Sequence, residues 1–244
     1  MTRNEKAKIA TMAFLVFLVI LIYCFFRKNK LPDKVDILDE LYQAPLQTEI
    51  RKDSFDVKEK GITYTISPLY EYALYGLVVS YHHSATWWDY YHEDSQDYLN
   101  VKDLCVIWGD NIASEVYKNM TFQSGSWTCY PDFKRGVNRN ERSKYKDNCL
   151  SNNHLLLDKK AIRKTLMATR VGDQIYFKGY LVSYTRDGWG GVSRGTSTTR
   201  DDCKCETIYL TDYAILKKGN PGWDFLFQVS KYAVFVCAIV FFFV

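Results

Sequence analysis

The sequence predicts a mainly β fold of the α+β class, a small coiled sheet with one or two short helices, carried on an N-terminal transmembrane helix. The 244 residues include 19 Tyr, 14 Phe and 6 Trp, and this aromatic load favours strands over helices. Residues 174–184 alternate between two faces with the period of a strand. Residues 9–26 are apolar and uncharged, with a length near the lower limit for a membrane-spanning helix.

The strand of residues 174–184 is predicted to pair with a second strand over residues 206–216. Together the two strands form the last hairpin of the domain. Gly179 lies inside the first strand, where a glycine marks a bulge, a bend or a close approach of another backbone. Gly76 has the same position in another long strand, expected over residues 70–81. Long strands with an internal glycine are what a coiled, barrel-like sheet requires.

Shorter elements complete the predicted domain. Strands are expected over residues 62–66, 104–108 and 122–130, with a turn at Ser67-Pro68 after the first. Helices are expected over residues 110–120 and 158–169, the second with Asp158 as its N-cap. The order of elements is closest to a five-stranded OB-like barrel, in which a helix also precedes the last hairpin. We therefore expect one β-rich domain over residues 61–218.

Both ends of the chain are candidates for the membrane. After a tail of residues 1–8, residues 9–27 are expected to form an uncleaved anchor, because no small-residue cleavage site follows the apolar core. Residues 28–60 contain the prolines and charges of a tether. The apolar C-terminal segment, residues 225–244, is a candidate second transmembrane helix, with packing on the domain as the alternative.

The location of the domain depends on weak signals. Basic residues flank both ends of the first span, so the positive-inside bias nearly cancels. Long domains cross a membrane largely regardless of charge, and the cysteines of this domain favour an oxidising compartment. We therefore expect an inner-membrane protein with the N-terminus inside and the domain in the periplasm. A net charge of +4 is too small to argue for nucleic acid, which stays open as a partner beside the membrane.

Four of the seven cysteines are candidates for disulfides. The other three lie in apolar segments: Cys24, Cys105 and Cys237. The candidates are Cys129, Cys149, Cys203 and Cys205, which allow three connectivities. A bridge between Cys129 and Cys149 would close a short loop. Unpaired thiols are the main alternative, and a zinc site is disfavoured because one residue alone separates Cys203 from Cys205.

The loop of residues 82–97 holds three histidines beside carboxylates. The histidines are His82, His83 and His92. Their spacing matches no zinc-hydrolase pattern, and Trp87 and Trp88 fit a surface loop pinned to the sheet. Neither a metal nor another cofactor is predicted.

His154 follows a polar stretch, Ser151-Asn152-Asn153, that is typical of a turn whose side chains bond to nearby backbone. A structural role therefore fits this histidine better than general-base chemistry. Nucleophilic catalysis would need Ser151 or Cys149 beside it, and neighbours in sequence need not meet in space. No catalytic residue is predicted.

The loop of residues 185–202 is the strongest functional candidate in the sequence. Its glycines let backbone N–H groups converge, and its arginines suit phosphate or carboxylate. In OB-like barrels this hairpin loop commonly contacts the ligand. A flexible surface loop is the alternative. The predicted ligand-binding residues are His154, Arg186, Trp189, Arg194, Ser197, Thr198, Thr199 and Arg200.

Four stretches resemble an uncharacterised family of bacterial membrane-anchored proteins. They are YTISPLYEYALYGLVVS (64–80), SNNHLL (151–156), VGDQIYFKGYL (171–181), and RGTSTTRDD (194–202) followed by CETIYL (205–210). The resemblance covers residues 43–216 and carries no known activity. It implies a bacterial origin and an envelope setting, and it assigns no catalytic residue.

Three functions are compatible with these patterns. The first, which the sequence favours, is a membrane-anchored binding module of the bacterial envelope that takes an anionic ligand or a protein partner on the 185–202 loop. The second is an envelope hydrolase for phosphodiester or cell-wall substrates that uses His154 with the Ser/Thr/Arg loop. The third is a structural subunit of an envelope complex.

Overall fold

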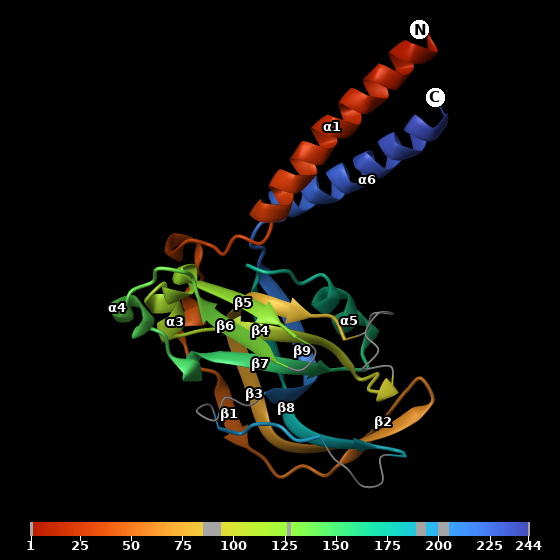
Figure 1. The fold of residues 1–244 in the computed structure, drawn as a ribbon. Helices are drawn as coiled ribbons and strands as arrows, with labels where there is room; N and C mark the ends of the chain where they lie inside the picture. The colour runs from red at the N-terminus through yellow and green to blue at the C-terminus, as the bar shows by residue number, and fades with distance from the viewer. Residues whose placement is uncertain (1, 85–93, 126–127, 189–193, 200–204, 244) are drawn as a thin grey trace. The chain divides into compact units, whose positions relative to one another are not determined.

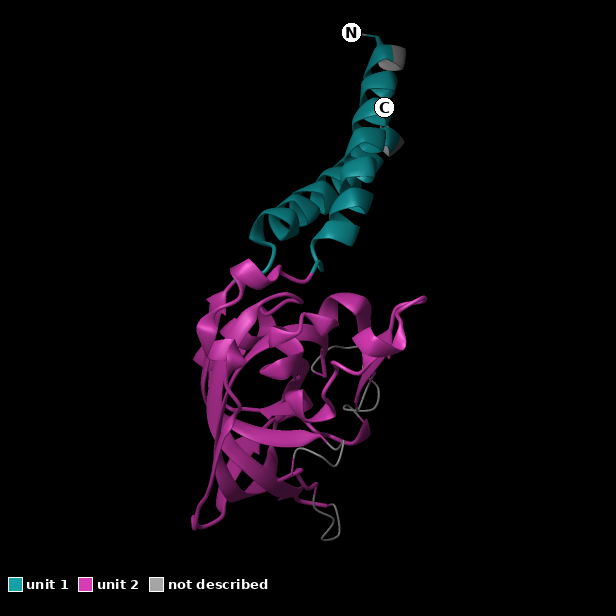
Figure 2. Ribbon diagram, turned by 90° about the vertical axis from the view of Figure 1, so that its left-hand side faces the viewer, with its two compact units in different colours: residues 1–30, 218–244 teal, residues 31–217 magenta. Residues whose placement is uncertain are grey.

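A computed structural model describes residues 2–84, 94–125, 128–188, 194–199 and 205–243 (Figure 1). The chain divides into two compact units (Figure 2). The first holds the two chain ends, residues 1–30 and 218–244, and the second is the domain Leu31–Lys217. The fold belongs to the predicted α+β class, and the predicted N-terminal apolar helix is present.

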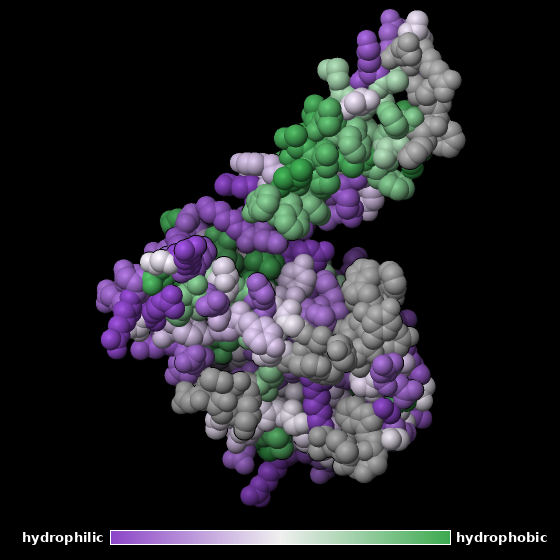
Figure 3. Space-filling view, viewed as in Figure 1, coloured by the Kyte–Doolittle hydropathy of each residue, from purple (hydrophilic) through white to green (hydrophobic). Residues whose placement is uncertain are grey.

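The first unit consists of two long helices, α1 (Arg3–Arg27) and α6 (Pro221–Phe243). Thr2 caps α1 because its hydroxyl accepts from the Glu5 N–H while the Glu5 carboxylate accepts from the Thr2 N–H. Both helices are long and apolar enough to cross a membrane, over Glu5–Arg27 and Pro221–Phe241. Figure 3 shows the hydrophobic residues that gather over them.

The two helices are joined at the ends that adjoin the domain in sequence. Asn220 Nδ2 donates to the carbonyls of Lys28 and Lys30, at 3.1 Å and 2.6 Å. The Arg27 guanidinium lies 5.4 Å from the centroid of the Trp223 ring. A basic side chain stacked on an aromatic ring is typical of a membrane–water interface.

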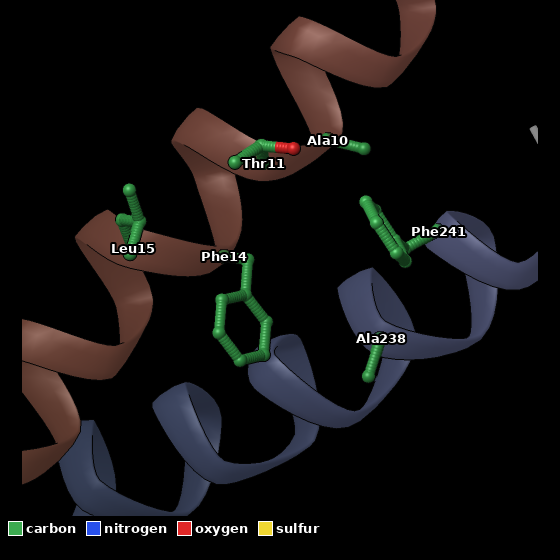
Figure 4. Close-up of a pocket in the computed structure, with 6 residues that line it drawn as sticks. All are labelled: Ala10, Thr11, Phe14, Leu15, Ala238 and Phe241. Carbon is green, nitrogen blue, oxygen red and sulfur yellow. The ribbon is translucent and has the colours of Figure 1, made fainter.

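An apolar pocket of about 370 Å³ opens between the two helices (Figure 4). Its lining residues are Ala10, Thr11, Phe14, Leu15, Ala238 and Phe241. The hydroxyl of Thr11 donates to the Ala7 carbonyl of its own helix. The lining is therefore a hydrocarbon surface, which suits a lipid chain and offers no chemistry.

The domain is built on a seven-stranded sheet whose pairings return to their starting strand. The order runs from β3 (Ile62–His82) to β4 (Asn100–Ile107), β7 (Leu150–Leu156), β9 (Glu206–Lys217), β8 (Gln174–Arg186) and back to β3. These pairs are antiparallel except β7 with β9, which is parallel. The strands β1 (Leu46–Glu49) and β2 (Phe55–Glu59) add to β3.

The strand β3 is one element of 21 residues rather than the two predicted strands. The predicted turn at Ser67-Pro68 is wrong, because the chain continues through it with a register shift between Pro68 and Tyr70 against β8. A bulge of this kind accommodates a proline, which has no N–H for the ladder. Its length lets β3 pair with several strands.

The two glycines predicted to mark close approaches do so. A Cβ at Gly179 would lie 2.2 Å from the carbonyl oxygen of Tyr209, beside a register shift in the pairing of β8 with β9. A Cβ at Gly76 would lie 2.2 Å from Cγ1 of Val106. Both glycines therefore let neighbouring strands approach as the sheet coils.

The main core combines side chains from the paired strands with one helix, α5 (Lys160–Met167). Its fully buried members include Leu74, Val106, Leu155, Leu166, Phe177 and Ile208. The buried Lys102 donates from Nζ to the carbonyls of Leu166 and Thr169, at 3.3 Å and 2.8 Å. A cation is favoured at this C-terminal end of α5, because the helix dipole is negative there. Asp158, the predicted N-cap, instead accepts from the Tyr209 hydroxyl.

A second cluster joins β3 and β4 to segments before β1 and after β4. It includes Leu41, Leu77, Ile107, Ile112 and Tyr117. The predicted helix over residues 110–120 is two short turns, α3 (Asp110–Ala113) and η3 (Val116–Asn119), separated by Glu115 with φ of 56°. The predicted strand over residues 122–130 is a hairpin of β5 (Met120–Ser124) and β6 (Cys129–Phe133).

The disulfide joins Cys105 of β4 to Cys129 of β6. The predicted bridge between Cys129 and Cys149 is therefore wrong. The apolar neighbours of Cys105 predicted that this cysteine is buried, and it is. Its side chain is nevertheless bonded to Cys129, another member of the second cluster. Cys149 and Cys205 form no disulfide with any described residue, and Cys203 lies outside the described residues.

The domain begins at Leu31 rather than near Gly61, so most of the predicted tether of residues 28–60 belongs to the fold. It forms the turns η1 (Lys34–Asp36) and η2 (Asp39–Tyr42) and the strands β1 and β2. Leu41 is fully buried. The charges of this segment are mostly exposed, and a few apolar residues anchor it. Between β6 and β7 lie α4 (Arg139–Arg142) and η4 (Asp147–Cys149).

Candidate functional site

Asp103, His154 and Cys205 form a line of hydrogen-bonded side chains in the domain. Nδ1 of His154 lies 2.8 Å from Oδ1 of Asp103, where the ring nitrogen donates to the carboxylate. The imidazole also forms a side-chain hydrogen bond with the thiol of Cys205. Because Nδ1 is engaged by the carboxylate, Nε2 is the nitrogen left for the sulfur. Thiol, imidazole and carboxylate thus follow one another as in a catalytic triad.

Strand register brings these three residues together from distant parts of the sequence. The pairing of β4 with β7 sets Asp103 opposite His154, and the pairing of β7 with β9 sets His154 opposite Thr207. Directly paired residues present their side chains on the same face of a sheet. Cys205 lies two positions before Thr207, so the period of a strand directs it to that face as well.

Burial, charge and hydrogen bonding shift the pKa values of the His154 imidazole and the Cys205 thiol in opposite directions. Burial alone lowers the pKa of His154, but the charge and hydrogen bond of Asp103 and the bond to Cys205 outweigh it and raise this pKa to about 9. Burial raises the pKa of the Cys205 thiol, but the hydrogen bond and charge of His154, with a further bond from Asn152, bring this pKa below its usual value. Both shifts favour the thiolate–imidazolium form of the pair over its neutral form.

Two asparagines complete the surroundings of this line. Asn100 Nδ2 donates at 3.0 Å to Oδ1 of Asp103, the same carboxylate oxygen that His154 contacts. Asn152 Nδ2 lies 3.4 Å from the sulfur of Cys205. Asp103 is fully buried, and His154 is 3% exposed, whereas Cys205 is only partly buried. Cys205 is therefore the most exposed residue of the three.

A second buried cluster consists of Asp97, Tyr184 and Arg194. Oδ2 of Asp97 accepts from the Tyr184 hydroxyl at 2.8 Å and from Arg194 Nη1 at 2.9 Å. The side chain of Asp97 is 2% exposed and that of Arg194 is 20% exposed. Arg194 also acts electrostatically on Asp103 and His154, which brings this cluster within reach of the triad.

The segment of residues 194–199 is fixed beside the start of β9. Arg194 pairs with Tyr184 through two backbone bonds of 2.7 Å and 2.9 Å. The Ser197 N–H donates to the carbonyl of Cys205 at 3.0 Å, and the Thr207 hydroxyl donates to the carbonyl of Gly195 at 2.9 Å. This part of the predicted loop is thus hydrogen-bonded to Cys205 and to the start of β9, which follows it.

The predicted ligand-binding residues are distributed unevenly over this structure. Trp189 and Arg200 lie outside the described residues. The guanidinium of Arg194 is engaged by Asp97, and the hydroxyl of Ser197 donates to the Thr199 carbonyl at 2.5 Å. The Thr198 carbonyl accepts from Gln47 Nε2. Arg186 donates to the Asp187 carbonyl at the end of β8. Binding of a ligand by these residues stays a prediction.

His154 lies in the site, but in a strand rather than in the turn predicted from its polar neighbours. Residues Ser151, Asn152 and Asn153 belong to β7 and are buried. Sequence reasoning also missed Asp103 and the nucleophilic role open to Cys205, which was considered for a disulfide, an unpaired thiol or a zinc site. A signal was present: Lys102 and Asp103 directly precede the apolar run of β4, and charges inside a central strand need a buried partner.

No group of three or more His, Cys, Asp or Glu residues is arranged to hold a metal ion in the part of the chain that the structure describes. Cys203, which was weighed with Cys205 for a zinc site, lies outside the described residues. His83, from the histidine-rich loop, has a pKa lowered to about 4, first by burial and then by the charge of Lys102. A neutral imidazole in this position does not extend the triad.

Comparison of the chain with protein-family models, with curated proteins and with solved structures gives no match. The geometry of the site therefore carries the functional argument.

The buried charge of Asp97 leads to a prediction about Arg194. Replacing Arg194 by Ala should lower the free energy of unfolding of the protein by about 3 kcal/mol, because it leaves a buried carboxylate without its cation. Chemical denaturation measures this change, and Arg139→Ala in the exposed helix α4 is the matched control, with an expected change within about 0.5 kcal/mol. Equal stability of the two variants would show that the pair of Arg194 with Asp97 does not stabilise the fold.

Proposed function

We propose that the domain is a thiol-dependent acyl transferase or hydrolase in which Cys205 is the nucleophile, His154 the general acid and base, and Asp103 the residue that orients the imidazole. The observation that carries the proposal is the hydrogen-bonded line from carboxylate to imidazole to thiol. A nucleophile beside a base that a third group orients is the arrangement that covalent catalysis requires. The proposal shares His154 with the envelope-hydrolase alternative of the sequence, which named phosphodiester or cell-wall substrates, used the Ser/Thr/Arg loop and assigned no nucleophile.

The chemistry of such a site follows from its three groups. The Cys205 thiolate attacks the carbonyl carbon of an ester, thioester or amide and forms a C–S bond, while the carbonyl π electrons move to oxygen. The tetrahedral intermediate collapses and expels the leaving group, which takes its proton from His154. Water or an amine then attacks the thioester, gives a proton to the same imidazole, and releases the Cys205 thiolate. Asp103 keeps Nδ1 protonated through both steps.

The proposed fold of the domain is an OB-type barrel. Its support is the closed order of pairings through β3, β4, β7, β9 and β8, with one parallel pair and with α5 before the last hairpin. In OB folds the second and third strands and the adjoining loops bind the ligand. By this assignment Asp103 and His154 lie on those two strands and Cys205 ends one of those loops, so the thiol would stand on the usual binding face.

The proposed location is the periplasmic side of a bacterial inner membrane. Two apolar helices at the ends of the chain support a hairpin anchor, with both termini on one side and the domain on the other. The disulfide between Cys105 and Cys129 supports an oxidising compartment for the domain. A phosphatase reporter that is active only in the periplasm should be active when fused after Lys217 and inactive when fused after Val244. The opposite pattern would contradict this topology.

Acylation of Cys205 is the direct test of the proposed activity. With Cys24, Cys149, Cys203 and Cys237 replaced by Ser, incubation with p-nitrophenyl acetate should add one acetyl group to the protein, detected by intact-mass spectrometry and lost in the Cys205→Ser variant. His154→Gln should slow acylation by about a hundredfold or more, since general-base assistance is worth about 10²–10⁴ in rate. Asn148→Gln, an exposed change away from the triad, is the matched control and should leave the rate unchanged.

Two results would contradict the proposal. One is a protein that stays unmodified at Cys205 while the ester hydrolyses at its background rate. The other is acylation that proceeds equally fast in the His154→Gln variant, since the thiol would then react without its base.

A further inference from the structure

The side chain of Asn152 contacts the sulfur of Cys205. Its Nδ2 atom lies 3.4 Å from that sulfur. Asn152 stands two positions before His154 on β7, so the period of the strand sets the amide and the imidazole on one face. The thiol of Cys205 therefore interacts with both the imidazole and an amide donor.

The position of Asn152 is held firmly by the fold. The residue is 5% exposed and lies inside a central strand paired on both sides, with β4 and with β9. Its partner in the β4 register is Cys105, which the disulfide ties to β6. A donor fixed in this way does not have to reorganise when charge develops near it, which is the condition for effective transition-state stabilisation.

The oxygen that becomes negative during acyl transfer is only two bonds from the attacking sulfur. A donor in contact with the sulfur is therefore close to the position that this oxygen will occupy. Productive donors lie about 2.7–3.1 Å from that position. An amide N–H is also the right chemical type, because it carries no charge of its own that would compete with the imidazolium.

We infer that Asn152 is a catalytic residue of this site and donates its Nδ2–H to the oxyanion of the tetrahedral intermediate. The inference rests on the proposed function, because it needs Cys205 to attack a carbonyl carbon. It extends that function by naming the electrophile that the site is built for: a carbonyl compound whose oxygen gains negative charge, rather than a disulfide or an alkylating centre. The resting bond to sulfur is replaced by a bond to oxygen as the C–S bond forms.

Two electrophiles separate this role from a merely structural one. p-Nitrophenyl acetate reacts through an oxyanion, whereas iodoacetamide alkylates a thiolate by direct displacement and forms none. Both rate constants are measured in the full-length protein in detergent, with Cys205 as the only thiol and the disulfide intact. The ratio of the acylation rate to the alkylation rate then reports the oxyanion step and cancels changes in thiolate content.

In the Asn152→Ala variant the ratio should fall by about a hundredfold, because loss of one oxyanion donor costs about 10²–10³ in rate. The isosteric Asn152→Asp variant keeps the shape of the side chain and should show the same loss, so a packing defect in the alanine variant does not decide the result. The Asn111→Ala variant, which removes an amide that bonds to the carbonyls of Lys146 and Cys149, is the matched control with an unchanged ratio.

An unchanged ratio in both Asn152 variants would overturn the oxyanion role and leave the proposed function intact. It would mean that the amide acts on the thiolate alone, since both reactions would then slow together. A parent protein that iodoacetamide alkylates at Cys205, but that p-nitrophenyl acetate never acylates, would overturn the proposed function and the role of Asn152 with it.

Discussion

The hydrogen bond between Asp103 and His154 is the constraint on which the rest of the domain depends. Both side chains are buried, and an ion taken out of water costs several kcal/mol unless a partner compensates it. The two charges must therefore face each other across β4 and β7. Because a slip of one residue would turn every side chain of a strand to the other face, the pair also fixes the register on which the position of Cys205 depends.

A buried ion pair of this kind is weak support for stability. Apolar residues of similar volume often replace such pairs with no loss, or with a gain, in the free energy of unfolding. The site also contains Asp97 with Arg194, so one region of the domain holds two such pairs. The surrounding structure reinforces the region, since the disulfide at Cys105 lies two positions from Asp103 on β4. The presence of two such pairs near the Cys205 thiol supports the proposed chemistry.

Local patterns in the sequence predicted much of the fold. Alternation predicted β8, β9 and both halves of β3, internal glycines supported β8 and the second half of β3, and the uncharged stretch predicted α1. The patterns failed where tertiary contacts override local preference. Pro68 suggested a turn, yet a bulge carries it through β3, and the charged segment before Gly61 is anchored by single buried residues such as Leu41.

The candidate site was predicted in part, because its residues meet only through strand order. The sequence singled out His154 as a structural histidine and Cys205 as a disulfide candidate. Their contact depends on the parallel pairing of β7 with β9, which α5 and β8 separate in the sequence. No spacing rule relates residues 103, 154 and 205 in a sequence. The disulfide shows the same limit. Cys105 was excluded from the disulfide candidates because its neighbours in the sequence are apolar, yet it lies with its partner Cys129 in one apolar cluster.

The ionisation of Cys205 tests the central claim most directly. The ultraviolet absorbance of a thiolate can be followed against pH in the protein with Cys205 as its only thiol, with the Cys205→Ser protein as the blank. The lowered pKa of Cys205 predicts that the thiolate band persists to lower pH than the band of an ordinary thiol. In the His154→Gln protein the band should shift toward the ordinary thiol value of about 8.5. A band that appears near that value in both proteins would contradict the thiolate–imidazolium pair and the activity built on it.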